Sequence, residues 1–158
     1  MSKRLYLFIT VCILALSSCG EEIATRVFEC GLLAEESEWV PTDASILASI
    51  HATVKFGLCT CEKMKGTLMR YREENAWTDS WNRRVAGLAN CNPPNVELGQ
   101  GIGHQAYTTA LIHELVHIQE CPWMNTDHEG WKENGTYDVI TKARYAAEEE
   151  VFPKDAGP

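Results

Sequence analysis

The stretch from residue 110 to residue 120 reads ALIHELVHIQE, and the rest of the chain is interpreted outward from it. Apolar residues recur there at the spacing of one helix face, which predicts a helix from about Gln105 to Glu120. Pro122 ends it, because the residue before a proline avoids helical geometry. His113 and His117 are four residues apart, so both imidazoles are expected on one side of this helix, one turn apart.

Two imidazoles at this spacing can bind one zinc ion from a rigid support. Glu114 follows the first histidine, and in such a motif the glutamate is no ligand but accepts a proton from the attacking water. The sequence therefore predicts a Zn²⁺ site with His113 and His117 as ligands and Glu114 as general base. The alternative is that the two histidines merely decorate a helix surface.

A catalytic zinc needs a third protein ligand and an open fourth position. His128 is the leading candidate, because the five residues 123–127 can bring the chain back from Pro122 toward the metal. Asp127 and Glu129 flank it as alternative ligands, or as carboxylates that orient imidazoles. A carboxylate among residues 148–150 is a further alternative.

The other elements follow from periodicity and turn residues. Helices are expected over about 44–56, with Asp43 as cap, over 62–75, and over 136–150, with Thr136 as cap. Short strands are expected over 84–89 and 95–98 and form a hairpin or a connected pair. Residues 77–82 are expected to form a turn and residues 123–135 a loop.

The segments 84–88 (RVAGL), 96–98 (VEL) and 111–117 (LIHELVH), followed by His128 and Trp131, resemble the zincin metallopeptidases, with the SprT-like group closest. The resemblance covers roughly residues 77–140. It implies an α+β fold in which the metal helix packs on a short β-sheet with flanking helices, three histidine ligands, and zinc-dependent hydrolysis of a protein or peptide substrate. That group is typically intracellular and associated with DNA, whereas this chain is expected to be exported and is acidic, so DNA–protein crosslinks are not expected substrates.

Hydrolysis also needs a donor for the oxyanion that develops on the substrate. Tyr137, which follows His128 at the start of the last helix, is the first candidate, and His104 is the second. Both residues can equally be structural.

The N-terminus has the features of a bacterial lipoprotein signal. Lys3 and Arg4 precede a short apolar run, and Leu16-Ser17-Ser18 leads directly to Cys19. We expect a signal peptide over 1–18, a lipidated Cys19 with a tether over 19–42, and the zincin-like domain over 43–158. The lipid would hold the protein on a membrane of the cell envelope, at the outer membrane or the periplasmic face. A plain signal peptide cut near Ser18, or an N-terminal membrane anchor, is the alternative.

Charge and cysteine content restrict the partners and the compartment. The formal net charge of −8 makes nucleic acid an unfavourable partner, and no feature indicates an oligomeric state. Of seven cysteines, five follow Cys19, and disulfides are the default in an exported chain. Cys91 with Cys121 is the preferred pair, whereas Cys59 and Cys61 are too close to bridge each other easily. The competing function is an inactive zinc-binding or disulfide-stabilised surface lipoprotein that serves as an interaction module.

Overall fold

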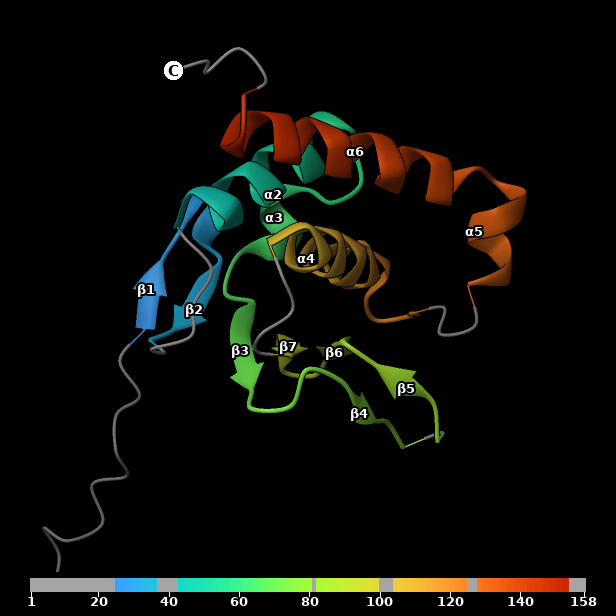
Figure 1. Cartoon of the computed structure of the whole chain (residues 1–158). Coiled ribbons are helices and arrows are strands. Elements are labelled where there is room, and N and C mark those ends of the chain that lie inside the picture. Colours follow the sequence, from blue (N-terminus) through green and yellow to red (C-terminus); the bar gives the residue numbers. More distant parts are fainter. Residues whose placement is uncertain (1–24, 37–42, 81, 100–103, 125–127, 154–158) are drawn as a thin grey trace, which may run out of the picture.

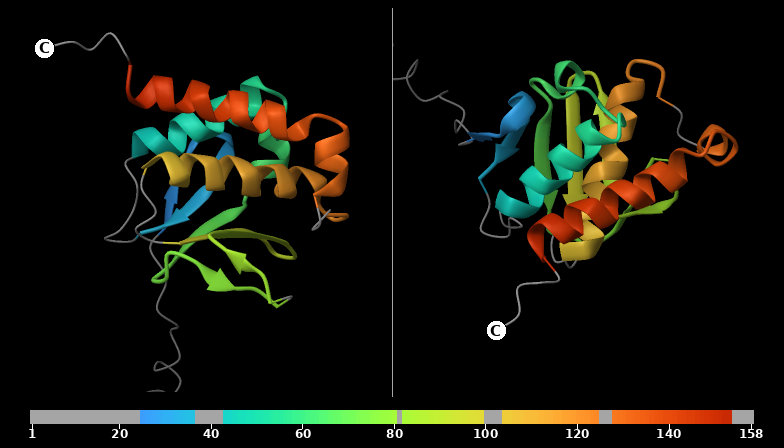
Figure 2. Two further views of the ribbon diagram at one scale, coloured as in Figure 1. Left: turned by 45° about the vertical axis from the view of Figure 1, so that its right-hand side comes forward. Right: turned by 90° about the horizontal axis from the view of Figure 1, so that it is seen from above.

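The computed structural model describes residues 25–36, 43–80, 82–99, 104–124 and 128–153 (Figure 1). Within these residues the fold is α+β, as expected, with the helices on one face of a mixed sheet (Figure 2). The helical elements, in chain order, are η1 (Glu29–Gly31), α2 (Asp43–Lys55), α3 (Cys61–Met64), α4 (His104–Glu120), α5 (Glu129–Glu133) and α6 (Thr136–Val151). The strands are β1 (Thr25–Val27), β2 (Leu33–Glu35), β3 (Leu68–Arg72), β4 (Trp77–Thr78), β5 (Arg84–Val85), β6 (Gly87–Cys91) and β7 (Pro94–Gly99).

Five strands form the main sheet in the order β1-β2-β3-β7-β6. The central pairs β2–β3 and β3–β7 are parallel, and the outer pairs β1–β2 and β6–β7 are antiparallel. The expected hairpin is therefore present, with Ala89 opposite Val96. Its outer strand β6 forms one edge of the sheet, and the separate β4–β5 pair precedes it in the chain.

The central helix α4 separates two apolar cores. On one side Leu111 and Leu115 pack with Met69 and Val96 from the sheet in a first core. On another side Ile112 and Val116 pack in a second core, formed with the helices α2, α5 and α6. Burial of α4 on two sides stabilises it by apolar surface removed from water and leaves its third side for polar side chains.

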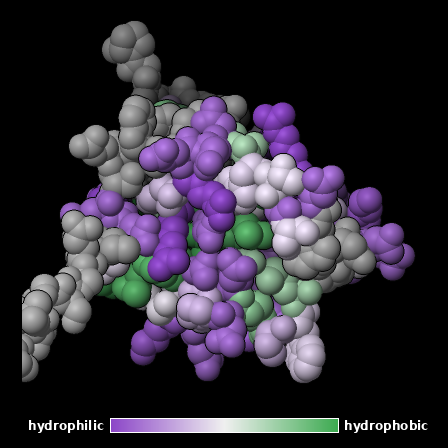
Figure 3. All heavy atoms as spheres, turned by 90° about the horizontal axis from the view of Figure 1, so that it is seen from below, coloured by the Kyte–Doolittle hydropathy of each residue, from purple (hydrophilic) through white to green (hydrophobic). Residues whose placement is uncertain are grey.

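The opposite face of the sheet is charged. Arg70 on β3 pairs with Glu35 on β2 at 2.9 Å, and Arg72 pairs with Glu97 on β7 at 2.5 Å. Seen from below, hydrophilic side chains cover much of this face (Figure 3). No helix in the described part of the chain is long and apolar enough to cross a membrane.

Four expectations about the elements were wrong. The helix expected over 62–75 stops at α3, because Gly66 adopts a left-handed conformation (φ 77°) and the following residues pair with β2 and β7 as β3. The tether expected over 19–42 includes β1 and β2, which are ordinary strands of the sheet. The turn over 77–82 contains β4, and the loop over 123–135 contains α5. The expected domain start at residue 43 is therefore too late.

Candidate metal centre

The third side of α4 carries two histidines of the site. His113 and His117 lie one turn apart, with ring centroids 5.1 Å from each other, as the four-residue spacing predicts. His117 is only 5% exposed. Both side chains line a cleft of about 800 Å³, whose other wall is built from β5 and β6.

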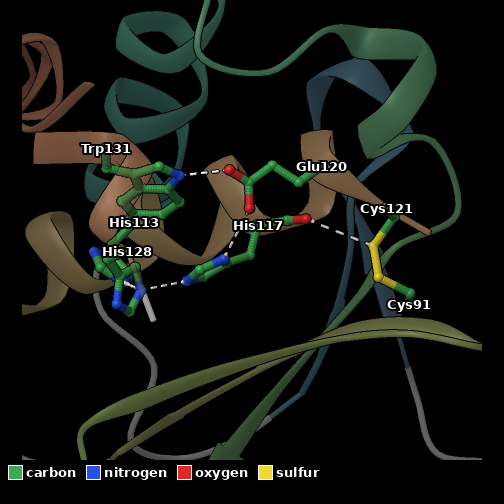
Figure 4. A network of polar contacts seen from close by, with 7 residues as sticks. All are labelled: Cys91, His113, His117, Glu120, Cys121, His128 and Trp131. Carbon is green, nitrogen blue, oxygen red and sulfur yellow. Dashed lines mark hydrogen bonds and ion pairs between the residues drawn. A yellow bond between two sulfur atoms is a disulfide. The ribbon is translucent and has the colours of Figure 1, made fainter. Parts of the chain in front are cut away.

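His128 closes the group of three from a different element. It directly precedes α5 and has left-handed backbone angles (φ 60°, ψ 10°), which a non-glycine residue rarely adopts. Its Nε2 atom lies 2.8 Å from Nε2 of His117 and 3.1 Å from Nε2 of His113 (Figure 4). The expected third histidine is therefore brought to the first two.

The three nitrogens fit a metal ion. The ligand atoms of His113, His117 and His128 all lie within 4.8 Å of one another. Ligand nitrogens of tetrahedral zinc, each about 2.0–2.1 Å from the metal, lie about 3.3 Å apart. Three neutral imidazoles that aim unprotonated nitrogens at one point repel one another unless a cation lies between them. The group could therefore hold a metal ion.

The carboxylate of Glu120 and the indole of Trp131 orient His117 from the Nδ1 side of its ring. Nδ1 of His117 lies 3.4 Å from Oε2 of Glu120, one turn further along α4. Oε1 of the same carboxylate accepts a hydrogen bond of 2.5 Å from the indole N–H of Trp131 (Figure 4). If Nδ1 carries the proton toward Glu120, Nε2 keeps its lone pair for a metal, which is the usual arrangement around metal-bound histidines.

Trp131 also packs against the whole group. Its ring centroid lies 4.5 Å from that of His117, 4.7 Å from that of His128 and 4.9 Å from that of His113. The side chain is 2% exposed and belongs to the second core. The position of the three imidazoles is thus fixed by packing as well as by their own elements.

Burial keeps His113 and His117 neutral. It lowers the pKa of His113 to about 3, and the nearby His117 and His128 add to that effect. Burial also lowers the pKa of His117 to about 4, with further electrostatic contributions from His128 and Arg83. Since only neutral imidazole binds a metal, the site is ready to accept one near neutral pH.

Glu114 is a buried carboxyl beside the histidines. It is 6% exposed, lines the same cleft and is hydrogen-bonded by the backbone of Ala89 on β6. Burial raises the pKa of Glu114 to about 8, although the bond from Ala89 opposes the shift. Gly87 makes room for it, since a Cβ atom there would come within 2.6 Å of Oε1 of Glu114.

The remaining candidates do not join this group. The ring of Tyr137 packs against Trp131, with centroids 5.8 Å apart, and lies 6.3 Å from the ring of His128, but Tyr137 is absent from the residues that line the cleft. Glu129 adjoins His128 but is not one of the three grouped residues, and Glu150 binds His51 instead at 2.8 Å. Asp127 and Cys19 lie outside the described residues, as does the side chain of His104.

The five cysteines in the described part of the chain form two disulfides and leave one free thiol. Cys91 at the end of β6 is joined to Cys121, directly after α4, as expected, with Cα atoms 5.5 Å apart. Cys30 is joined to Cys61, so Cys61 does have a distant partner. Cys59 is a buried free thiol.

Two residues of the site escaped the sequence analysis in their actual role. Glu120 lies three residues after His117, which is a spacing that places both on one helix face and could have indicated the contact. Trp131 has no such signal, because its contact with Glu120 depends on where α5 folds back.

No family model, no curated protein and no solved structure matches the chain.

Proposed function

We propose that this protein is a zinc-dependent metallopeptidase. The observation that carries the proposal is one juxtaposition: three imidazoles converge at the wall of a cleft, and the buried carboxyl of Glu114 lies beside them in the same cleft. A site that only stabilises a fold has no use for an additional titratable group of this kind. An all-imidazole donor set with an open side is typical of catalytic zinc.

The chain's own residues supply the steps of hydrolysis. Zinc in this site would act as a Lewis acid that lowers the pKa of water to about 7. Glu114 accepts a proton from the water as the oxygen of that water attacks the carbonyl carbon of the scissile peptide bond. The same carboxyl then donates that proton to the leaving amine nitrogen as the C–N bond breaks.

The open edge of β6 favours an extended substrate. In the described part of the chain β6 has a partner on one side only, and Gly87, Leu88 and Ala89 line the cleft opposite α4. An extended peptide can pair with such an edge through main-chain hydrogen bonds. It would then run directly past Glu114 and the histidines.

The test separates metal binding from hydrolysis in one set of variants. Zinc content is measured by elemental analysis, and cleavage is measured on a protein substrate mixture. We expect about one zinc per chain in the wild type and in Glu114→Gln, and its loss in His113→Ala and His128→Ala. His51→Ala and Glu133→Gln are the matched controls, because neither residue lines the cleft or belongs to the group of three histidines.

Cleavage should fall about 10²- to 10⁴-fold in Glu114→Gln although zinc is retained. An active Glu114→Gln protein would sink the proposed mechanism. Zinc without any cleavage in the wild type would favour the inactive interaction module instead. If the wild type binds no zinc even when zinc is supplied, the remaining hypothesis is a disulfide-stabilised structural protein.

A further inference from the structure

Two arginines lie on the wall of the cleft that faces the metal helix. Arg83 and Arg84, at the start of β5, both line it, although the chain as a whole has a formal net charge of −8. Among the described residues that line the cleft, Glu114 is the acidic one, and its carboxyl is buried against β6. Arg84 therefore brings positive charge to the cleft of an acidic protein.

Arg83 is held in place by a buried carboxylate. The side chain of Asp79 is 1% exposed, and Nε and Nη2 of Arg83 both lie 2.8 Å from its Oδ2 atom. The backbone N–H of Arg83 donates to Oδ1 of Asp79 at 2.8 Å, and the N–H of Asp79 donates to the carbonyl of Arg83 at 2.9 Å. The guanidinium is thus fixed by a closed loop, while 42% of the Arg83 side chain remains exposed.

The guanidinium of Arg83 borders the same cleft as the histidines. Arg83, Glu114 and His117 all line it, so a molecule bound there can meet all three side chains. Arg84 follows with no tie to Asp79 among the contacts of the described residues. A pre-oriented guanidinium with a second one beside it matches the planar geometry of a carboxylate.

We propose that Arg83 and Arg84 bind a carboxylate of the substrate, so that the preferred substrates are acidic peptides with aspartate or glutamate near the scissile bond. The position of this carboxylate relative to a cleaved bond rests on the proposed function, but the preference for acidic peptides can be measured without cleavage. In the cleft the carboxylate is partly shielded from water, which makes its attraction to the arginines stronger than on an open surface.

The test uses the full chain with Glu114→Gln, so that no peptide is cleaved. The probes are fluorescein-labelled hexapeptides of alanine with one glutamate at each position in turn, and the same set with glutamine. Binding is followed by fluorescence anisotropy at low salt. At the best position we expect the glutamate peptide to bind about 10-fold more tightly, and raised salt should reduce this preference.

Arg84→Gln and Arg83→Gln should each reduce the preference toward unity and leave the glutamine peptides unchanged. Arg70→Gln, which removes the same charge from the far face of the sheet, should retain it. Arg84→Gln leaves the Asp79–Arg83 pair intact, so it decides the question if Arg83→Gln does not fold.

Equal binding of both peptides at every position, no binding of either, or equal effects of Arg84→Gln and Arg70→Gln would each overturn the inference. If the preference is found but the wild type never cleaves, the proposed function fails and the carboxylate site stands.

Discussion

At the residue scale, the proposed role of His117 as a metal ligand depends on its partner Glu120. The carboxylate lies between the imidazole Nδ1 and the indole N–H of Trp131. A carboxylate only accepts hydrogen bonds, so it selects the tautomer in which Nδ1 is protonated and Nε2 is available. An amide in its place can present an N–H to Nδ1 and so favour the other tautomer.

Glu120→Gln should therefore weaken zinc binding by about 10- to 100-fold while the fold is retained. The affinity is measured by competition with a chromophoric chelator, with Glu133→Gln on the exposed side of α5 as control. If the affinity of Glu120→Gln equals that of the control, Glu120 serves only to hold Trp131.

The two ligands on α4 could be predicted from sequence because helix geometry fixes the relation between residues four apart. His128 could be suggested only by chain length, since its left-handed backbone and the course of residues 123–127 set where its ring points. Arg83 gave no signal at all: its orientation depends on Asp79, and nothing in the sequence marks that aspartate as buried. Lipidation of Cys19 and export stay predictions.

At the element scale, α4 and β6 form the two walls of the cleft, and the Cys91–Cys121 disulfide joins them at one end. The sulfur of Cys121 lies 3.6 Å from the carbonyl oxygen of His117, so the cross-link reaches the turn that carries a ligand. The second disulfide, Cys30–Cys61, joins η1 to α3, and neither of its cysteines lines the cleft.

Replacing Cys91 and Cys121 by alanine should lower the free energy of unfolding by about 3 to 4 kcal/mol, because the bond closes a loop of 30 residues. The Cys30/Cys61 double alanine variant removes a disulfide that closes a loop of 31 residues, so it is a matched control with a similar expected loss of stability. Urea unfolding measures both. Zinc affinity should fall only in the first variant, and an equal fall in both would show that the cross-link has no local role at the cleft.

The elements that the sequence predicted are those whose pattern is local. Helices α2, α4 and α6 and the β6–β7 hairpin carry their periodicity and turn residues within themselves. The strand β3 was mistaken for helix because its place between β2 and β7 is decided by parallel partners distant in sequence. The strands β1 and β2 are three residues each, too short for an alternating pattern to be recognised.

At the scale of the whole molecule, His51 joins distant parts of the chain. From α2 it contacts Glu150 on α6 at 2.8 Å and Glu29 on η1 at 3.0 Å. The hydrogen bond with Glu150 raises the pKa of His51, burial opposes this, and Glu29 raises the pKa further. A histidine whose pKa is raised on folding stabilises the protein fully below about pH 6.5, and this contribution is lost as the pH rises through the folded value.

His51→Gln should accordingly lower the melting temperature at pH 6 and have little effect at pH 9. The corresponding loss in the free energy of unfolding at pH 6 should stay below about 1 kcal/mol, because the His51 side chain is 42% exposed and water screens its ion pairs. Thermal unfolding in the presence of a chelator measures it without interference from metal. A variant that is destabilised equally at both pH values would show that His51 acts by packing alone.

The buried thiol of Cys59 can be used as a chemical probe of local unfolding. It is 1% exposed, and burial raises the pKa of Cys59 to about 11, so almost none of it is the reactive thiolate at neutral pH. The other four cysteines of the described segments are locked in disulfides. In protein that begins after Cys19, alkylation of Cys59 would therefore require the first core to open. The alkylation rate would measure how often this opening occurs, even when the open state is too rare to be detected by spectroscopy.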